Sequence, residues 1–132
     1  MKKVKKKSEI DNKAIGQRIR EEREKLELSR EKFAEIIGLS DYYVGQLERG
    51  ERQMSLRVLF KIARCLHVSL DYLIFGKTVH DTYQVQDARN TYKAVEDNKY
   101  KEINILLDKC SPEELELVKK LIKTILPYTG KN

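Results

Sequence analysis

The feature that most constrains this chain is a serine placed directly before each of several short apolar segments between residues 14 and 76. A serine hydroxyl can accept a hydrogen bond from an unpaired amide in the first turn of a helix, which favours serine at helix starts. The serines at these positions are Ser29, Ser40, Ser55 and Ser69. Glycines that follow such segments can end a helix in the left-handed conformation; they are Gly38, Gly50 and Gly76. The pattern predicts a run of five short helices and no strand.

The predicted third helix, after Ser40 and before Gly50, differs from the others. The first helix, about 13–25, and the remaining helices carry apolar residues at helical spacing. In the third, only Val44 and Leu47 form an apolar contact. The residues predicted to look outward are Asp41, Tyr42, Tyr43, Gly45 and Gln46. A helix with so little apolar surface is unsuited to a core, so it needs another role.

The joint before this helix is only about three residues long, from Gly38 to Ser40. Such a short connection makes two helices cross steeply instead of packing as an antiparallel hairpin. The small side chain of Ala34 would permit a close approach at the crossing. This arrangement is a helix-turn-helix, whose second helix can lie in the major groove of DNA.

The segment over residues 15–76 resembles the Cro and phage-repressor helix-turn-helix family, also called the xenobiotic-response-element family. The shared features are the LS pairs before helices two and three, Ala34, Gly38, the LERG ending, and the closing series SL, LFKIA, L and VSLDYL. Their order and spacing together make the resemblance specific. It implies an all-α fold, with a five-helix repressor-like DNA-binding domain over residues 14–76.

The resemblance also implies roles for particular residues. The residues expected to contact bases are Asp41, Tyr42, Gly45 and Gln46. The residues expected to contact the DNA backbone are Arg30, Ser40, Tyr43, Arg49 and Arg52. Arg23 and Glu48 match positions that form a structural ion pair in the family. Arg30 departs from the family, which often has glutamine there, and the change favours a phosphate contact.

The chemistry of these side chains fits base reading. The Gln46 amide can pair bidentately with adenine, and Asp41 can accept from a cytosine amino group. Gly45 leaves a gap at the groove floor, which a neighbour can reach. Alternatively, Tyr42 or Tyr43 packs on helix two, and Gln46 is a surface residue. Arg18 and Arg20 are further phosphate candidates, or members of a solvated face.

The segments that flank the domain differ in character. Residues 1–13 form a basic arm with six lysines and two acidic residues, and they carry most of the net charge of +6. Such an arm suits a polyanion, because each lysine at a phosphate releases counterions, but it is also typical of a solubilising tail. Residues 77–97 are predicted to be a linker.

Residues 98–132 are predicted to form a short helical hairpin for oligomerisation. Its second helix begins with a capping box, with Ser111 as the cap, Pro112 at the first position and Glu114 completing the box. The apolar face is wider than one short partner helix would hide. The residues expected at a dimer interface are Ile103, Leu106, Leu107, Leu115, Val118, Leu121, Ile122 and Ile125. The alternative is that this hairpin packs back on the DNA-binding domain.

Several function classes are not expected. The sequence contains no apolar run of membrane-spanning length and no secretory signal, so a cytoplasmic location and no membrane partner are expected. Cys65 and Cys110, far apart and among apolar neighbours, are expected to be reduced, buried thiols. The alternatives are a disulfide, a metal pair or a redox-sensor role. No metal-ligand set, phosphate loop or catalytic constellation is apparent, so we expect no cofactor and no enzyme activity.

The sequence therefore predicts a DNA-binding transcriptional regulator that binds double-stranded DNA. The most specific reading is a homodimeric repressor that reads an inverted-repeat operator with helix 40–49. An alternative is an antitoxin or anti-repressor whose carboxy-terminal helices bind another protein. A third hypothesis, an effector-sensing switch, requires a pocket between the carboxy-terminal segment and the domain.

Overall fold

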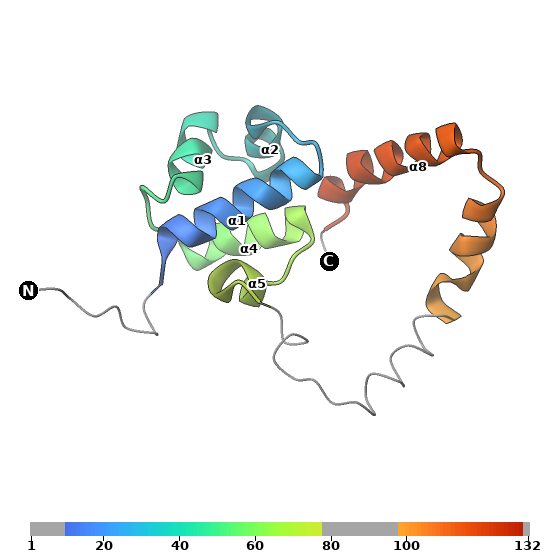
Figure 1. The fold of residues 1–132 in the computed structure, drawn as a ribbon. Helices are drawn as coiled ribbons and strands as arrows, with labels where there is room; N and C mark the ends of the chain where they lie inside the picture. The colour runs from blue at the N-terminus through green and yellow to red at the C-terminus, as the bar shows by residue number, and fades with distance from the viewer. Residues whose placement is uncertain (1–9, 78–97, 131–132) are drawn as a thin grey trace, which may run out of the picture.

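The computed structural model describes residues 10–77 and 98–130, and this part of the chain contains helices and no strand (Figure 1). Residues 10–77 form the amino-terminal domain. Its helices are α1 (Asn12–Lys25), α2 (Arg30–Ile37), α3 (Asp41–Glu48), α4 (Leu56–Leu66) and α5 (Leu70–Phe75). Residues 98–108 are helical, and α8 (Pro112–Ile125) and the 3-10 turn η1 (Leu126–Tyr128) follow. The predicted all-α fold class is confirmed.

Serine caps begin four of the five helices of this domain. In α2 to α5, the serine Oγ accepts from the amide three residues later. The N···O distances are 3.0 Å at Ser29, Ser40 and Ser69, and 3.2 Å at Ser55. Because these bonds join residues close in the chain, the sequence alone was enough to locate the helix starts.

Helix α1 begins earlier than the predicted domain boundary at residue 14. Its cap is Asp11, whose carboxylate accepts from the amide of Ala14 at 3.1 Å. Asn12 and Lys13, which the sequence analysis placed in the basic arm, are therefore helical. Residues 1–9 of the arm, and the linker after Lys77, lie outside the described residues.

The core of the domain draws on all five of its helices. Its most deeply buried side chains, each under 2% exposed, are Ile19, Phe33, Val44, Leu47, Ile62 and Leu73. Burying an aliphatic or aromatic side chain of this size stabilises a fold by about 1.5–3 kcal/mol. Helix α3 contributes two of the six, which fixes its rotation and leaves its polar face turned outward.

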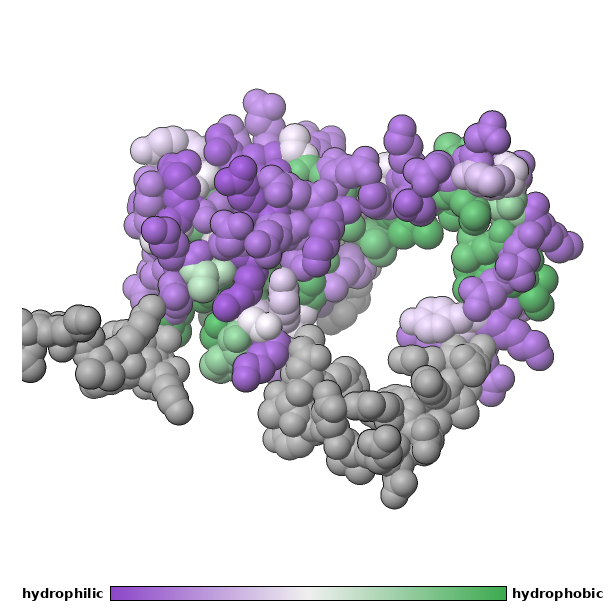
Figure 2. All heavy atoms as spheres, in the orientation of Figure 1, coloured by the Kyte–Doolittle hydropathy of each residue, from purple (hydrophilic) through white to green (hydrophobic). Residues whose placement is uncertain are grey.

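Residues 98–125, which we call the carboxy-terminal arm, extend away from the domain (Figure 1). The two helices of the arm meet at a bend around Cys110 and Ser111. The capping box that begins α8 is present, with the Ser111 amide donating to Glu114 Oε1 at 2.8 Å and the Glu114 amide donating to Ser111 Oγ at 3.1 Å. Figure 2 shows apolar atoms running along both helices.

The turn η1 fastens the end of the arm to α4. The imidazole Nε2 of His67 donates to the carbonyl oxygen of Leu126 at 2.5 Å, and Pro127 is buried. A Cβ at Gly130 would lie 2.0 Å from the carbonyl oxygen of Arg64, so only glycine fits this approach. Beside this junction, Lys123 Nζ donates to Glu27 Oε2 at 2.6 Å. The arm is therefore docked at its carboxy-terminal end, while most of its apolar face stays uncovered.

Candidate nucleic-acid interface

The turn between α2 and α3 has the tight geometry that a helix-turn-helix requires. Gly38 ends α2 with φ 74°, and the amide of Leu39 donates to the carbonyl of Ala34 at 2.9 Å. Ala34 is buried where the helices approach each other. This turn holds α3 across α2, with the start of α3 beside the start of α2 (Figure 1).

The outward face of α3 carries the polar side chains expected to read bases. Tyr42 is 71% exposed, the largest exposure on this helix among its apolar and aromatic residues. Asp41 and Gln46 are partly exposed, whereas Val44 and Leu47 point into the core. The face is thus an accessible polar surface held on a rigid apolar base.

The structure brings Arg30 and Asp41 together as a bidentate ion pair. Arg30 Nε donates to Asp41 Oδ1 at 2.6 Å, and Nη2 donates to Oδ2 at 3.2 Å. The hydrogen bond from Arg30 lowers the pKa of the Asp41 carboxyl. The same bond to the Asp41 carboxylate raises the pKa of Arg30. Both side chains are about 40% exposed, so the pair lies at the surface. Sequence analysis assigned the two residues separate roles on DNA, and it missed that they contact each other.

Gly45 lies beneath two guanidinium groups. A Cβ built at Gly45 would lie 3.0 Å from Arg30 Nη1 and 3.1 Å from Arg49 Nη1. Gly45 faces the outer side of α3, as expected, but it is buried because the side chains of Arg30 and Arg49 cover it. The absent side chain gives Arg30 and Arg49 a place to lie on the surface of α3.

The remaining backbone-contact candidates surround α3. Arg49 pairs with Glu51 at 2.8 Å, which raises the pKa of the arginine, and the pair is half-exposed. The guanidinium of Arg52 lies over the Tyr43 ring at 5.6 Å from its centroid. Tyr43 is partly buried against the core. The Ser40 hydroxyl accepts from the amide of Tyr43 and so caps α3; in a phosphate contact this hydroxyl would be the donor.

Arg23 and Glu48 form an ion pair inside the domain. Arg23 Nε donates to Glu48 Oε2 at 2.7 Å and Nη2 donates to Oε1 at 3.0 Å. Arg23 Nη1 also donates to the carbonyl of Leu28 at 2.8 Å. Both charged residues are buried. Glu48 therefore ties α3 to α1 and does not face the outer surface.

Arg18 and Arg20, the further phosphate candidates on α1, have partners within the domain. Arg18 Nη1 donates to the carbonyls of Leu73 and Ile74 at the end of α5, at 2.8 and 3.2 Å. Arg20 pairs with Glu24 along the same helix. The tertiary role of Arg18 had no local signal in the sequence, because its partners lie more than 50 residues away.

The predicted dimerisation residues all lie on the arm. The exposed fractions of Ile103, Leu106, Leu121, Ile122 and Ile125 are between 45% and 57%. Leu107, Leu115 and Val118 are partly buried. The alternative that the hairpin packs back on the domain applies only to its carboxy-terminal end, and the contact of η1 with His67 was not predicted. The signal for it was weak: His67 follows α4 where a glycine would be usual, and it has φ 59°.

Both cysteines are free thiols, and burial raises the pKa of Cys65 to about 11. Within residues 10–77 and 98–130, no three His, Cys, Asp or Glu side chains are grouped so as to hold a metal ion. In the same ranges, no helix is long and apolar enough to cross a membrane.

Comparisons with known proteins match this architecture. The family model described as helix-turn-helix matches residues 19–73. An uncharacterized HTH-type transcriptional regulator of Mycobacterium tuberculosis is 38% identical over 96 residues, which are 70% of this chain and 66% of that protein. Control protein C.SmaI of Serratia marcescens is 37% identical over 60 residues, 46% of this chain and 71% of that protein.

A solved structure is also similar. It is the restriction-modification controller protein C.AhdI from Aeromonas hydrophila, with 41% identity and a TM-score of 0.47, over 48% of this chain and 97% of that chain. The chain spans just under two thirds of the mycobacterial relative. The mycobacterial relative is named as a transcriptional regulator, and the protein of Serratia marcescens as a control protein. The family match falls within the five helices of the domain, and the control protein is 37% identical to this chain over 71% of its own length, so the chain belongs to the Cro and phage-repressor type of the helix-turn-helix family.

Proposed function

We propose that this protein is a transcriptional regulator that binds double-stranded DNA with α3 in the major groove, and that it represses by occupying a promoter. The observation that carries the proposal is the exposed polar face of α3, with Arg30 and Arg49 over Gly45 and Arg52 over the Tyr43 ring. A major groove is wide enough to admit an α-helix, and arginines beside such a helix are suited to phosphate oxygens.

Two side chains on this face read bases in the proposal. Gln46 pairs with adenine through its amide, which offers one donor and one acceptor. Tyr42, which is exposed, contacts a thymine methyl or a base edge. Ser40 and Tyr43, at the start of α3, are proposed to contact the DNA backbone.

The Arg30–Asp41 pair is proposed to act as a unit. Asp41 holds two nitrogens of the guanidinium, which leaves Nη1 over Gly45 to donate to a phosphate. Asp41 reads a cytosine directly only where that base replaces Arg30 as its donor. Arg49, which also lies over Gly45, and Arg52 provide the further phosphate contacts. Substituting either member of the pair separates these roles, because a phosphate contact affects all sequences and a base contact affects one position.

We further propose that a second copy of the chain covers the arm. A single domain of this size reads few base pairs, and dimers of such domains bind half-sites about one helical turn apart. The uncovered side chains of Leu121, Ile122 and Ile125 on α8, with Ile103 and Leu106 on the preceding helix, support self-association. The same surface is compatible with the antitoxin or anti-repressor reading, in which a different protein covers it.

The experiment that tests the proposal is the selection of bound sequences from a random duplex pool at moderate salt with the full chain. We expect an enriched inverted repeat with half-sites about one turn apart. Gln46→Ala should relax the preference at one position per half-site, at a cost of about 1–3 kcal/mol there. Gln17→Ala, on the exposed side of α1, is the matched control and should change nothing.

Two results would contradict the proposal. Binding that depends on salt and enriches no sequence would leave only a nonspecific polyanion contact. An enriched site whose preference is unchanged in Gln46→Ala would mean that α3 is not placed in the groove as proposed. An enriched single half-site from a monomeric chain would keep the DNA-binding role and remove the dimer.

A further inference from the structure

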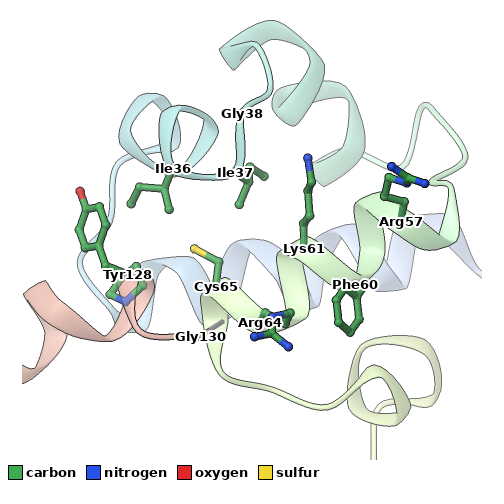
Figure 3. Close-up of a pocket in the computed structure, with 11 residues that line it drawn as sticks. Ile36, Ile37, Gly38, Arg57, Phe60, Lys61, Arg64, Cys65, Tyr128 and Gly130 are labelled. Atoms are coloured by element: carbon green, nitrogen blue, oxygen red, sulfur yellow. The ribbon is translucent and has the colours of Figure 1, made fainter. Parts of the chain in front are cut away.

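A groove of about 880 Å³ lies between the end of α2, the length of α4 and the turn η1 (Figure 3). Sites for small molecules in proteins have volumes of about 300–1,000 Å³, so the groove is large enough for one. Its apolar lining comes from Ile36 and Ile37 of α2, Phe60 and Cys65 of α4, and Pro127 and Tyr128 of η1. Both the amino-terminal domain and the carboxy-terminal segment therefore line the groove.

The charged lining of the groove is entirely basic. Arg57, Lys61 and Arg64 follow one another at spacings of four and three residues, which places them along one side of α4. None of the lining residues is acidic. In the part of the chain that the structure describes, neither Arg57 nor Lys61 forms an ion pair, and both are exposed. Lys61 points from α4 toward the turn after α2 (Figure 3).

We propose that this groove binds an organic carboxylate with an extended apolar body. The carboxylate lies at Lys61 and Arg57, where a charged hydrogen bond is stronger than one between neutral groups. The apolar body lies along Ile36, Ile37 and Tyr128, where it is removed from water. A small anion lacks the apolar contacts, and a neutral chain leaves the cations without a partner. The combination of cations and apolar wall selects a molecule that carries both features.

This site would give the protein an effector, which goes beyond DNA binding. The groove has one wall from the domain and one from η1, which is held by the bond between His67 and Leu126. A ligand that contacts both walls stabilises the docked position of the arm, because it binds that arrangement and not an undocked one. The position of the arm and the occupancy of the groove are thereby linked.

The test uses the full chain without DNA, so its outcome is independent of the proposed operator binding. Titration calorimetry compares decanoate with decan-1-ol, which lacks the charge, and with acetate, which lacks the chain. We expect decanoate to bind with a dissociation constant about ten-fold or more below that of either comparison ligand, as the added charged hydrogen bonds imply. Lys61→Glu should weaken decanoate binding by at least about ten-fold, since it replaces an attractive charge with a repulsive one.

Lys119→Glu, on the exposed face of α8 outside the groove, is the matched control and should leave the affinity unchanged. Because Lys61 is exposed, its substitution is not expected to disturb the fold. Equal affinity for decan-1-ol and decanoate would overturn the proposal, and so would no binding of decanoate. Binding that Lys119→Glu weakens and Lys61→Glu does not would place the ligand on the arm and would also overturn it.

Discussion

Removal of the Glu48 carboxylate is expected to destabilise the amino-terminal domain severely. The side chains of Arg23 and Glu48 are 10% and 6% exposed, and two hydrogen bonds join them. In Glu48→Ala, the Arg23 guanidinium stays in the interior and keeps its hydrogen bond to the carbonyl of Leu28. Breaking a buried pair in this way costs about 3–5 kcal/mol. That is a large part of the total stability of a small domain, which is about 5–15 kcal/mol.

Urea denaturation followed by circular dichroism measures this change. With a dependence on urea of about 1–3 kcal/mol per molar, the midpoint should fall by at least about 1 M. Glu51→Ala is the matched control, because it removes an exposed carboxylate from its pair with Arg49. That change should cost less than about 1 kcal/mol, as exposed pairs contribute little.

A double variant separates loss of the pair from burial of an unpaired charge. Arg23→Met with Glu48→Met fills the same region with apolar side chains and should recover most of the loss. If the double variant is no more stable than Glu48→Ala, an uncompensated charge is not the cause. If Glu48→Ala costs no more than Glu51→Ala, then Glu48 does not hold α3 against α1, and the reasoning from burial fails.

Three further outcomes are expected. Arg49→Ala should weaken binding to all duplex sequences alike and reduce the slope of log affinity against log salt by about one, measured by fluorescence anisotropy; a loss confined to one base position would contradict a phosphate contact. Leu121→Glu should shift the chain from dimer to monomer in sedimentation, because Leu121 belongs to the uncovered apolar face. Lys119→Glu should not, because Lys119 lies outside that face. A wild-type monomer at micromolar concentration would remove the dimer proposal. Burial raises the pKa of the Cys65 thiol to about 11, so a disulfide reagent at neutral pH should modify Cys65 more slowly than the partly exposed Cys110. In denaturant the two thiols should react at similar rates. Equal rates in the native protein would contradict the burial of Cys65.

The sequence by itself determined the helices and their order. Each serine cap bonds an amide three residues away, and each apolar stripe depends on spacings of three and four, so these signals are complete within a short segment. The same is true of the capping box at Ser111 and of the tight turn at Gly38. The polar face of α3 was likewise visible in the sequence, because a helix with only Val44 and Leu47 as apolar residues must leave its other side in solvent.

Only the tertiary structure decided how these faces are used. Arg30 and Asp41 are 11 residues apart, and the turn between α2 and α3 brings them together, with the Arg30 guanidinium over Gly45. His67 and Leu126 are 59 residues apart, and their contact docks the arm and forms one wall of the groove. No local pattern encodes such contacts, because a side chain meets its distant partner only after the core has fixed the rotation and position of both helices. The sequence therefore determined which surfaces the chain has, and packing determined which residues share them.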